Sequence, residues 1–99
     1  MISVYTTCRN RKEAEKIAAH LLKKRLIACA NFFPVDSKYW WKGKLEKSKE
    51  YALLMKARNG FKIIVQEIEK AHSYELPTIS MEKIKVSKKT AKWIKKEMK

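Results

Sequence analysis

The sequence predicts an α+β protein of the ferredoxin-like, split βαβ type, formed by a single domain over residues 1–99. The first observation is the order of its segments, which alternate between strand and helix patterns as β-α-β-β-α-β and end in one more helix. The second is composition, because 45% hydrophobic and 34% charged residues are typical of a globular chain. The third is length, since 99 residues supply one hydrophobic core. This topology gives an antiparallel sheet in the order 4-1-3-2, with two helices on one face.

The chain opens with a strand and a helix. Residues 2–7 are short and rich in β-favouring side chains, which predicts the first strand. Asn10 is a suitable N-cap for a helix over 11–24. That helix is expected because apolar residues recur there at helical spacing: Ala14, Ile17, Ala18, Leu21 and Leu22.

A long hairpin is expected next. Residues 26–34 are apolar on both alternating faces, which predicts a strand that is covered on both sides. The segment 34–37 interrupts this run, and aromatic side chains resume at 39–41. Lys42-Gly43-Lys44 predicts a turn, and residues 50–57 form the returning strand. The tip of this hairpin is expected to project beyond the sheet.

The remaining segments complete the pattern. Asn59-Gly60 precedes a predicted helix over 61–72, which Leu76-Pro77 ends. Ile79 and Met81 mark a fourth strand, and Ser87 caps a short terminal helix.

The open face of such a sheet needs a cover. Both strands of the hairpin carry apolar residues for both faces, and the helices cover only one face. A neighbouring subunit is the simplest cover, so the sequence predicts an obligate oligomer with an interface formed by the sheet. Trp40 and Trp41 are expected to pack in that interface, because assembly needs large apolar anchors.

The predicted topology gathers polar side chains at one end of the sheet. Strands one and four are antiparallel neighbours, and the second helix ends beside them. We therefore expect five residues to converge there: Thr6, Cys8, His72, Tyr74 and Glu75. A thiol, an imidazole and a carboxylate (Cys8, His72 and Glu75) suit copper or zinc. The alternative for His72 is a boundary residue that completes the apolar stripe of its helix, and Cys29 is expected to be an inert core thiol.

The charge of the chain allows a second interpretation. Lys and Arg number 24 against 10 Asp and Glu, a formal net charge of +14. A basic cluster at the opposite end of the sheet is a candidate anion site, formed by Lys24, Arg25, Lys56, Arg58, Lys83 and Lys85. A basic module that binds nucleic acid or another anion is therefore the alternative function. Strand 50–57 lacks the aromatic motif on which RNA-recognition modules stack bases, which argues against nucleic acid.

Several classes of protein lack support in the sequence. No apolar run reaches the roughly 18–20 residues of a membrane span, and the N-terminus has no secretory pattern. Two cysteines do not make a disulfide framework and favour an intracellular protein with free thiols. Catalysis is not expected, because the chain has no Gly-rich phosphate loop, Ser-His-Asp set or paired carboxylates.

Three blocks of the chain together resemble the CutA family of divalent-cation tolerance proteins. They are Arg25-Leu26-Ile27-Ala28-Cys29-Ala30-Asn31, Tyr39-Trp40-Trp41-Lys42-Gly43-Lys44 and His72-Ser73-Tyr74-Glu75-Leu76-Pro77. The resemblance implies a cytoplasmic homotrimer, similar in architecture to the PII signalling proteins. It also implies an association with Cu(II) or another divalent cation, and no settled catalytic activity.

Two departures from the family pattern concern the expected site. The usual His-Pro-Tyr-Glu is His72-Ser73-Tyr74-Glu75 here. Some members have a thiol where this chain has Thr6, and the nearest thiol here is Cys8, two residues on. Cys8 would share a strand face with Thr6 if the strand continued.

Overall fold

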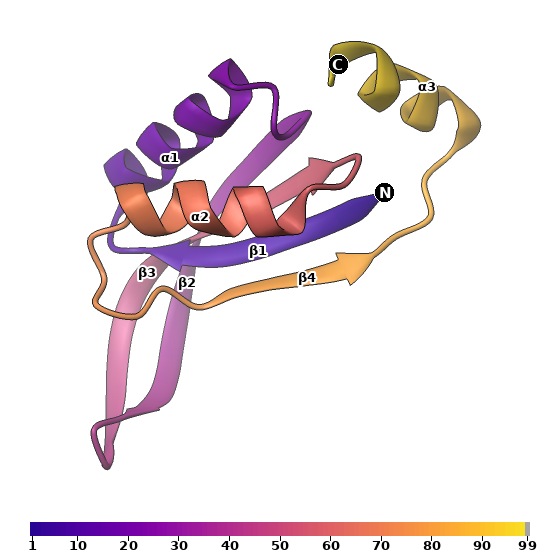
Figure 1. The fold of residues 1–99 in the computed structure, drawn as a ribbon. Coiled ribbons are helices and arrows are strands. Elements are labelled where there is room, and N and C mark those ends of the chain that lie inside the picture. Colours follow the sequence, from indigo (N-terminus) through magenta and orange to yellow (C-terminus); the bar gives the residue numbers. More distant parts are fainter. Residues whose placement is uncertain (99) are drawn as a thin grey trace.

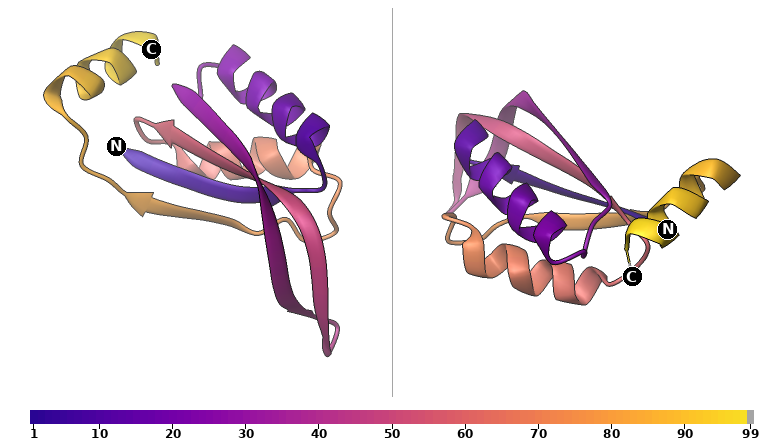
Figure 2. Two further views of the ribbon diagram at one scale, coloured as in Figure 1. Left: turned by 180° about the vertical axis from the view of Figure 1, so that it is seen from behind. Right: turned by 90° about the horizontal axis from the view of Figure 1, so that it is seen from above.

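The computed structural model describes residues 1–98 and confirms the ferredoxin-like fold. The elements are β1 (Ile2–Cys8), α1 (Arg11–Lys23), β2 (Cys29–Trp41), β3 (Lys44–Ala57), α2 (Phe61–Ala71), β4 (Ile79–Lys83) and α3 (Lys88–Glu97). The sheet is antiparallel in the order β2-β3-β1-β4, as expected. Helices α1 and α2 lie on the same face of the sheet, and α3 lies beyond the end of β4 (Figures 1 and 2).

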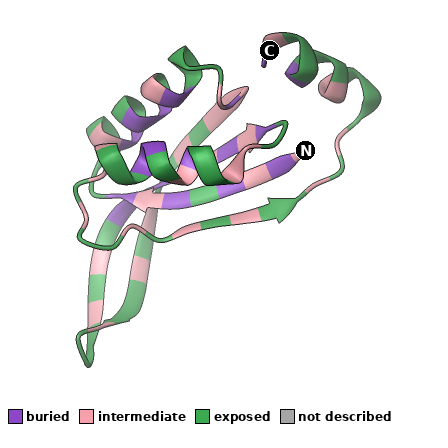
Figure 3. Ribbon diagram, viewed as in Figure 1, coloured by how far each residue is buried: buried purple, intermediate pink, exposed green. Residues whose placement is uncertain are grey.

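The core fills the layer between the sheet and the two helices. Val4 and Met55 pair across β1 and β3 and are fully buried, as are Leu21 of α1 and Ile68 of α2. The buried positions gather between these elements, whereas the outer helix faces are exposed (Figure 3). Ile94 anchors α3 by burying its side chain in the same core. No helix within residues 1–98 is both long and apolar enough to cross a membrane.

The second strand begins later than predicted. Residues 26–28 are not part of β2, because α1 ends at Lys23, its closing turn takes in Leu26, and β2 begins only at Cys29. Arg25 adopts a left-handed conformation with φ of 59°. The N–H of Leu26 donates to the carbonyl of Leu21, and that of Arg25 donates to the carbonyl of Leu22. This pair of bonds is a Schellman helix ending, which uses a residue with positive φ to satisfy the last carbonyls of a helix.

The predicted break at 34–37 is also wrong, since β2 continues without interruption through Pro34 to Trp41. An edge strand tolerates proline, because its outer N–H groups have no partner in the sheet, and β2 is at the edge.

The third strand begins earlier than predicted. It starts at Lys44 and not at residue 50, because its charged first half pairs with β2 outside the core. Lys42 and Gly43 join the strands with φ of 50° and 78°, as a two-residue hairpin turn with positive φ at both positions. The paired strands project well beyond the sheet, as expected (Figure 1).

Candidate metal site

Three side chains that could hold a metal ion meet where β1 ends. One donor atom each from Cys8, Glu13 and His72 lies within 4.8 Å of the others. Cys8 is the last residue of β1, Glu13 lies in the first turn of α1, and His72 directly follows α2. Split βαβ topology brings these positions together, because the end of α2 returns to the end of β1 at which α1 begins.

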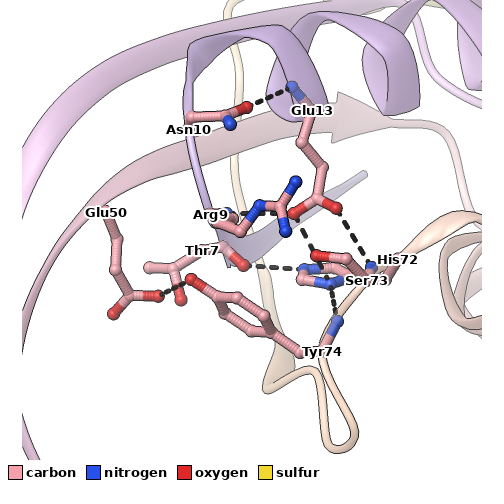
Figure 4. A network of polar contacts seen from close by, with 8 residues as sticks. All are labelled: Thr7, Arg9, Asn10, Glu13, Glu50, His72, Ser73 and Tyr74. Atoms are coloured by element: carbon pink, nitrogen blue, oxygen red, sulfur yellow. Dashed lines mark hydrogen bonds and ion pairs between the residues drawn. The ribbon is translucent and has the colours of Figure 1, made fainter.

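The N-cap of α1 determines where Glu13 lies. The Asn10 side chain accepts a hydrogen bond of 2.9 Å from the Glu13 N–H, as a helix N-cap does. The Glu13 carboxylate turns back and accepts from the backbone N–H of Arg9 at 2.9 Å. Its second oxygen accepts from the N–H of Ser73 at 3.0 Å. The cap therefore directs a carboxylate onto the segment that follows β1 (Figure 4).

The His72 ring has a fixed orientation. Its side chain is fully buried, and its Nε2 lies 2.8 Å from the carbonyl oxygen of Thr7. Its Nδ1 accepts from the Tyr74 N–H at 3.1 Å and lies 3.8 Å from a Glu13 oxygen. An Nδ1 that accepts carries no proton, so the neutral ring has its proton on Nε2 and donates it to Thr7. The Nδ1 lone pair is therefore directed at the Tyr74 N–H, with a carboxylate oxygen of Glu13 beside it (Figure 4).

The ionisation of Cys8 and Glu13 follows from their surroundings. Burial, followed by the negative charges of Glu13 and Glu50, raises the pKa of the Cys8 thiol to about 12. Burial also raises the pKa of Glu13, but the hydrogen bonds from Arg9 and Ser73 outweigh this effect, and the pKa is lowered. The cluster therefore holds a carboxylate beside a protonated thiol and an imidazole.

Tyr74 connects the cluster to the sheet. Its hydroxyl donates to a carboxylate oxygen of Glu50 at 2.8 Å, and its ring centroid lies 4.7 Å from that of His72. Burial, followed by the contact with Glu50, raises the pKa of the phenol. Tyr74 lies beside His72, as the sequence suggested. Its partner Glu50 was not among the predicted residues.

The other predicted residues are not among the three clustered donors. Glu75 is largely exposed, and its carboxylate lies 3.6 Å from the Lys42 ammonium. Thr6 is fully buried on β1, and its hydroxyl has no hydrogen-bond partner within residues 1–98. Trp40 and Trp41 lie on the projecting hairpin, where Trp40 is 74% exposed.

Glu13 is the ligand candidate that the sequence did not suggest. A signal was present, since Asn10 followed three residues later by Glu13 is the spacing of a helix capping box. In that motif the acidic side chain returns toward the residues before the helix, which here include Cys8. Glu75 was expected in its place because it follows the second helix, whose end the topology places beside the end of the first strand.

The donor atoms suit a transition metal or zinc. Thiolate, imidazole and carboxylate together favour copper or zinc over magnesium or calcium, which prefer oxygen ligands alone. The ligand atoms around a tetrahedral zinc ion are roughly 3.5 Å apart, given bonds of about 2.0–2.3 Å. The separations here, up to 4.8 Å, are somewhat larger, so the three donors have to move closer together and the Nδ1 of His72 has to give up its hydrogen bond from Tyr74 before they hold an ion.

The basic end of the sheet gives little support to an anion site. Lys24 lies 2.9 Å from the Glu67 carboxylate, and Arg25 lies 3.1 Å from that of Glu97. Two of the six cations in the predicted cluster therefore have acidic partners. A surface pocket of about 440 Å³ lies elsewhere, beside the start of α1, and its lining includes Arg9, Lys49, Asp36 and Glu50. Charges of both signs line it, so it does not favour an anion.

These features define a small ferredoxin-like protein with a buried thiol, imidazole and carboxylate at one end of its sheet. Residues 2–97 match the family described as CutA1 divalent ion tolerance protein. The chain belongs to this family.

Relatives of known identity agree with this assignment. The divalent-cation tolerance protein CutA of Pyrococcus horikoshii is 39% identical over 101 residues, which cover 100% of this chain and 99% of the relative. A solved structure of a periplasmic divalent cation tolerance protein CutA from Archaeoglobus fulgidus is 37% identical, with a TM-score of 0.96 and full coverage of both chains. A PII-like protein CutA from Nostoc sp. PCC 7120 is 29% identical, with a TM-score of 0.91 over 100% of this chain and 98% of that one.

Proposed function

We propose that this protein binds a divalent cation, copper or a similar ion such as zinc, through Cys8, Glu13 and His72. The observation that carries the proposal is the meeting of three donor atoms within 4.8 Å in a chain of a divalent ion tolerance family. Glu13 takes the position for which the sequence suggested Glu75. The net charge of +14 repels cations, so local ligands have to overcome that field.

The proposed role is binding or PII-like signalling and not catalysis. A nucleophilic cysteine needs an exposed thiolate. Cys8 is fully buried, and its pKa is raised to about 12 by that burial. A bound cation can replace the thiol proton, as metal ligation does, whereas a nucleophile needs the free thiolate that burial disfavours.

Calorimetric titration with Cu(II) and Zn(II) tests the site, with Mg(II) as a hard cation for comparison. We expect His72→Ala and Cys8→Ser to weaken binding of Zn(II) at least about tenfold, because each removes one ligand of a three-ligand site. His20→Ala and Cys29→Ser are matched controls, since His20 pairs with Glu67 and lies outside the cluster. Equal binding by wild type and His72→Ala would remove His72 from the site.

We further propose that three copies assemble into a homotrimer. The sheet face away from α1 and α2 leaves aromatic side chains partly exposed: Tyr5, Phe33 and Tyr39 are 37–41% exposed. A monomer seldom leaves such a face in water, so neighbouring subunits of the same kind would cover it, and three is the number that the resemblance to the CutA family implies. Light scattering should give about 35 kDa, three times the 11.7 kDa of the chain. A stable species of 11.7 kDa would contradict the trimer.

The cytoplasm is the proposed location. Both cysteines, Cys8 and Cys29, are free thiols, which suits a reducing compartment. The relative from Archaeoglobus fulgidus is described as periplasmic, so the two locations need to be distinguished by experiment. Fractionation of the source cells, followed by immunoblotting, should find the protein with cytoplasmic markers, and recovery with envelope markers would contradict the proposal.

A further inference from the structure

The segment Ser73–Glu75 connects the ligand cluster to the projecting hairpin. At one end, the Ser73 N–H donates to Glu13 and the Tyr74 N–H donates to Nδ1 of His72. At the other, the Tyr74 hydroxyl donates to Glu50 on β3, and the Glu75 carboxylate lies 3.6 Å from Lys42 in the hairpin turn. Consecutive residues thus contact both the ligands and the strands that leave the sheet.

We propose that Ser73–Glu75 is a latch that couples cation binding at Cys8, Glu13 and His72 to the position of the hairpin. The proposal rests on the proposed function, since it concerns the same site. It goes further by naming the element that senses occupancy and the part of the molecule that responds.

The coupling begins at the His72 ring. The Nδ1 lone pair already accepts a hydrogen bond of 3.1 Å from the Tyr74 N–H. One lone pair cannot both accept that bond and ligate a cation, and the Nε2 side is occupied by the carbonyl of Thr7 at 2.8 Å. Ligation through Nδ1 therefore requires the Tyr74 amide to leave the ring.

Movement of the Tyr74 backbone is transmitted through its side chain. The ring lies against His72 with a centroid distance of 4.7 Å, and the hydroxyl donates to Glu50 at 2.8 Å. Glu50 is 7% exposed, and Tyr74 is the hydrogen-bond donor to its side chain among the described residues. A buried carboxylate that loses its donor is destabilised, so β3 shifts or rehydrates at this point. The hydrogen bonds that Tyr74 makes to His72 and Glu50 in the metal-free protein therefore oppose binding of the cation.

Hydrogen exchange by NMR, on the assembled protein with and without Zn(II), tests the first step. We expect saturation with Zn(II) to accelerate exchange of the Tyr74 amide about tenfold or more, because its acceptor is lost. The Leu26 amide is the internal control, since it donates to Leu21 at the other end of α1. Unchanged or slower exchange at Tyr74, in a sample that calorimetry shows to be saturated, would overturn the latch.

A variant tests the second step through linkage. Tyr74→Phe removes the hydroxyl that holds Glu50, so the latch opens more easily and Zn(II) should bind about fivefold more tightly or better. Tyr39→Phe removes a comparable hydroxyl, which contacts Ser48 at 3.2 Å on the hairpin, and should leave the affinity unchanged. Wild-type affinity in Tyr74→Phe would show that no coupling exists.

The two proposals fail in different ways. If Zn(II) binds and His72→Ala weakens binding, the site stands, and unchanged Tyr74 exchange or unchanged Tyr74→Phe affinity overturns the latch alone. If the wild-type protein takes up neither Zn(II) nor Cu(II), the site and the latch are both overturned.

Discussion

Cys8, which is proposed as a ligand, lies where its thiol is unreactive. Its thiol is fully buried at the end of β1, beside the carboxylate of Glu13. Burial and the negative charge of Glu13 both disfavour the thiolate, so the thiol keeps its proton until a cation offers a compensating charge. Cys8 therefore serves as a packed core residue when no ion is bound.

The raised pKa of Cys8 predicts a loss of stability at high pH. Below pH 9 the thiol is protonated in both the folded and the unfolded protein, so its ionisation has no effect on the unfolding free energy. Between pH 9 and about 12 the unfolded chain loses this proton while the folded protein retains it, which favours unfolding. Urea unfolding at pH 8 and pH 10 should show a larger loss of unfolding free energy for wild type than for Cys8→Ser. The extra loss should be on the order of 1 kcal/mol, and equal losses would contradict the burial of the thiol.

At the level of elements, Glu67 holds the two core helices together. Its carboxylate on α2 lies 2.8 Å from His20 Nε2 and 2.9 Å from the Lys24 ammonium, so it joins α2 to the end of α1. Lys70 adds a third contact at 3.2 Å. The hydrogen bonds from Lys24, His20 and Lys70 lower the pKa of this carboxyl to about 2.

This carboxyl predicts a specific acid sensitivity. Because the pKa is lower in the folded protein, its stabilising effect is complete above the unfolded value of about 4.5 and is lost as pH falls toward about 2. Wild type should lose stability across that range, and Glu67→Gln should be less stable at pH 7 and lose less on acidification. Thermal unfolding between pH 7 and pH 3 measures the effect. Glu69→Gln on the same helix is the control, and parallel pH profiles for all three proteins would contradict the role of Glu67.

At the scale of the whole molecule, the charge is the dominant feature. The chain carries +14, and α3 contributes Lys88, Lys89, Lys92, Lys95 and Lys96 on the outside of the core. Like charges in a compact protein repel one another, and assembly of several copies would bring still more of them together.

The expected consequence is stabilisation by salt. Raising sodium chloride from about 10 mM to 150 mM shortens the screening length from roughly 30 Å to 8 Å, which weakens repulsion between distant lysines. The melting temperature at pH 7 should therefore rise by several degrees, and the variant Lys95→Glu/Lys96→Glu should show a smaller rise. A melting temperature that falls with salt would mean that attractive pairs outweigh the repulsion.

The sequence by itself determined the order of the elements and most of their bounds. Helical spacing of apolar residues placed α1 and α2 to within one residue, because each helix buries one continuous stripe. The caps Asn10 and Ser87 were also evident, and both accept the expected backbone hydrogen bond. The hairpin was harder to predict, since β2 and β3 extend beyond the core and need no apolar pattern there.

Only the tertiary structure decided which side chains form the cluster. The meeting of Cys8 with His72 could be expected from strand order, because topology fixes which ends of elements are neighbours. Strand order could not show that Glu13, and not Glu75, joins the cluster, because this depends on the direction in which each side chain leaves the backbone. A helix cap turns Glu13 inward, whereas Glu75 lies in a loop and reaches Lys42 in the hairpin turn. Pattern along a chain records which face is buried, but the contacts among polar groups arise only once the elements are packed.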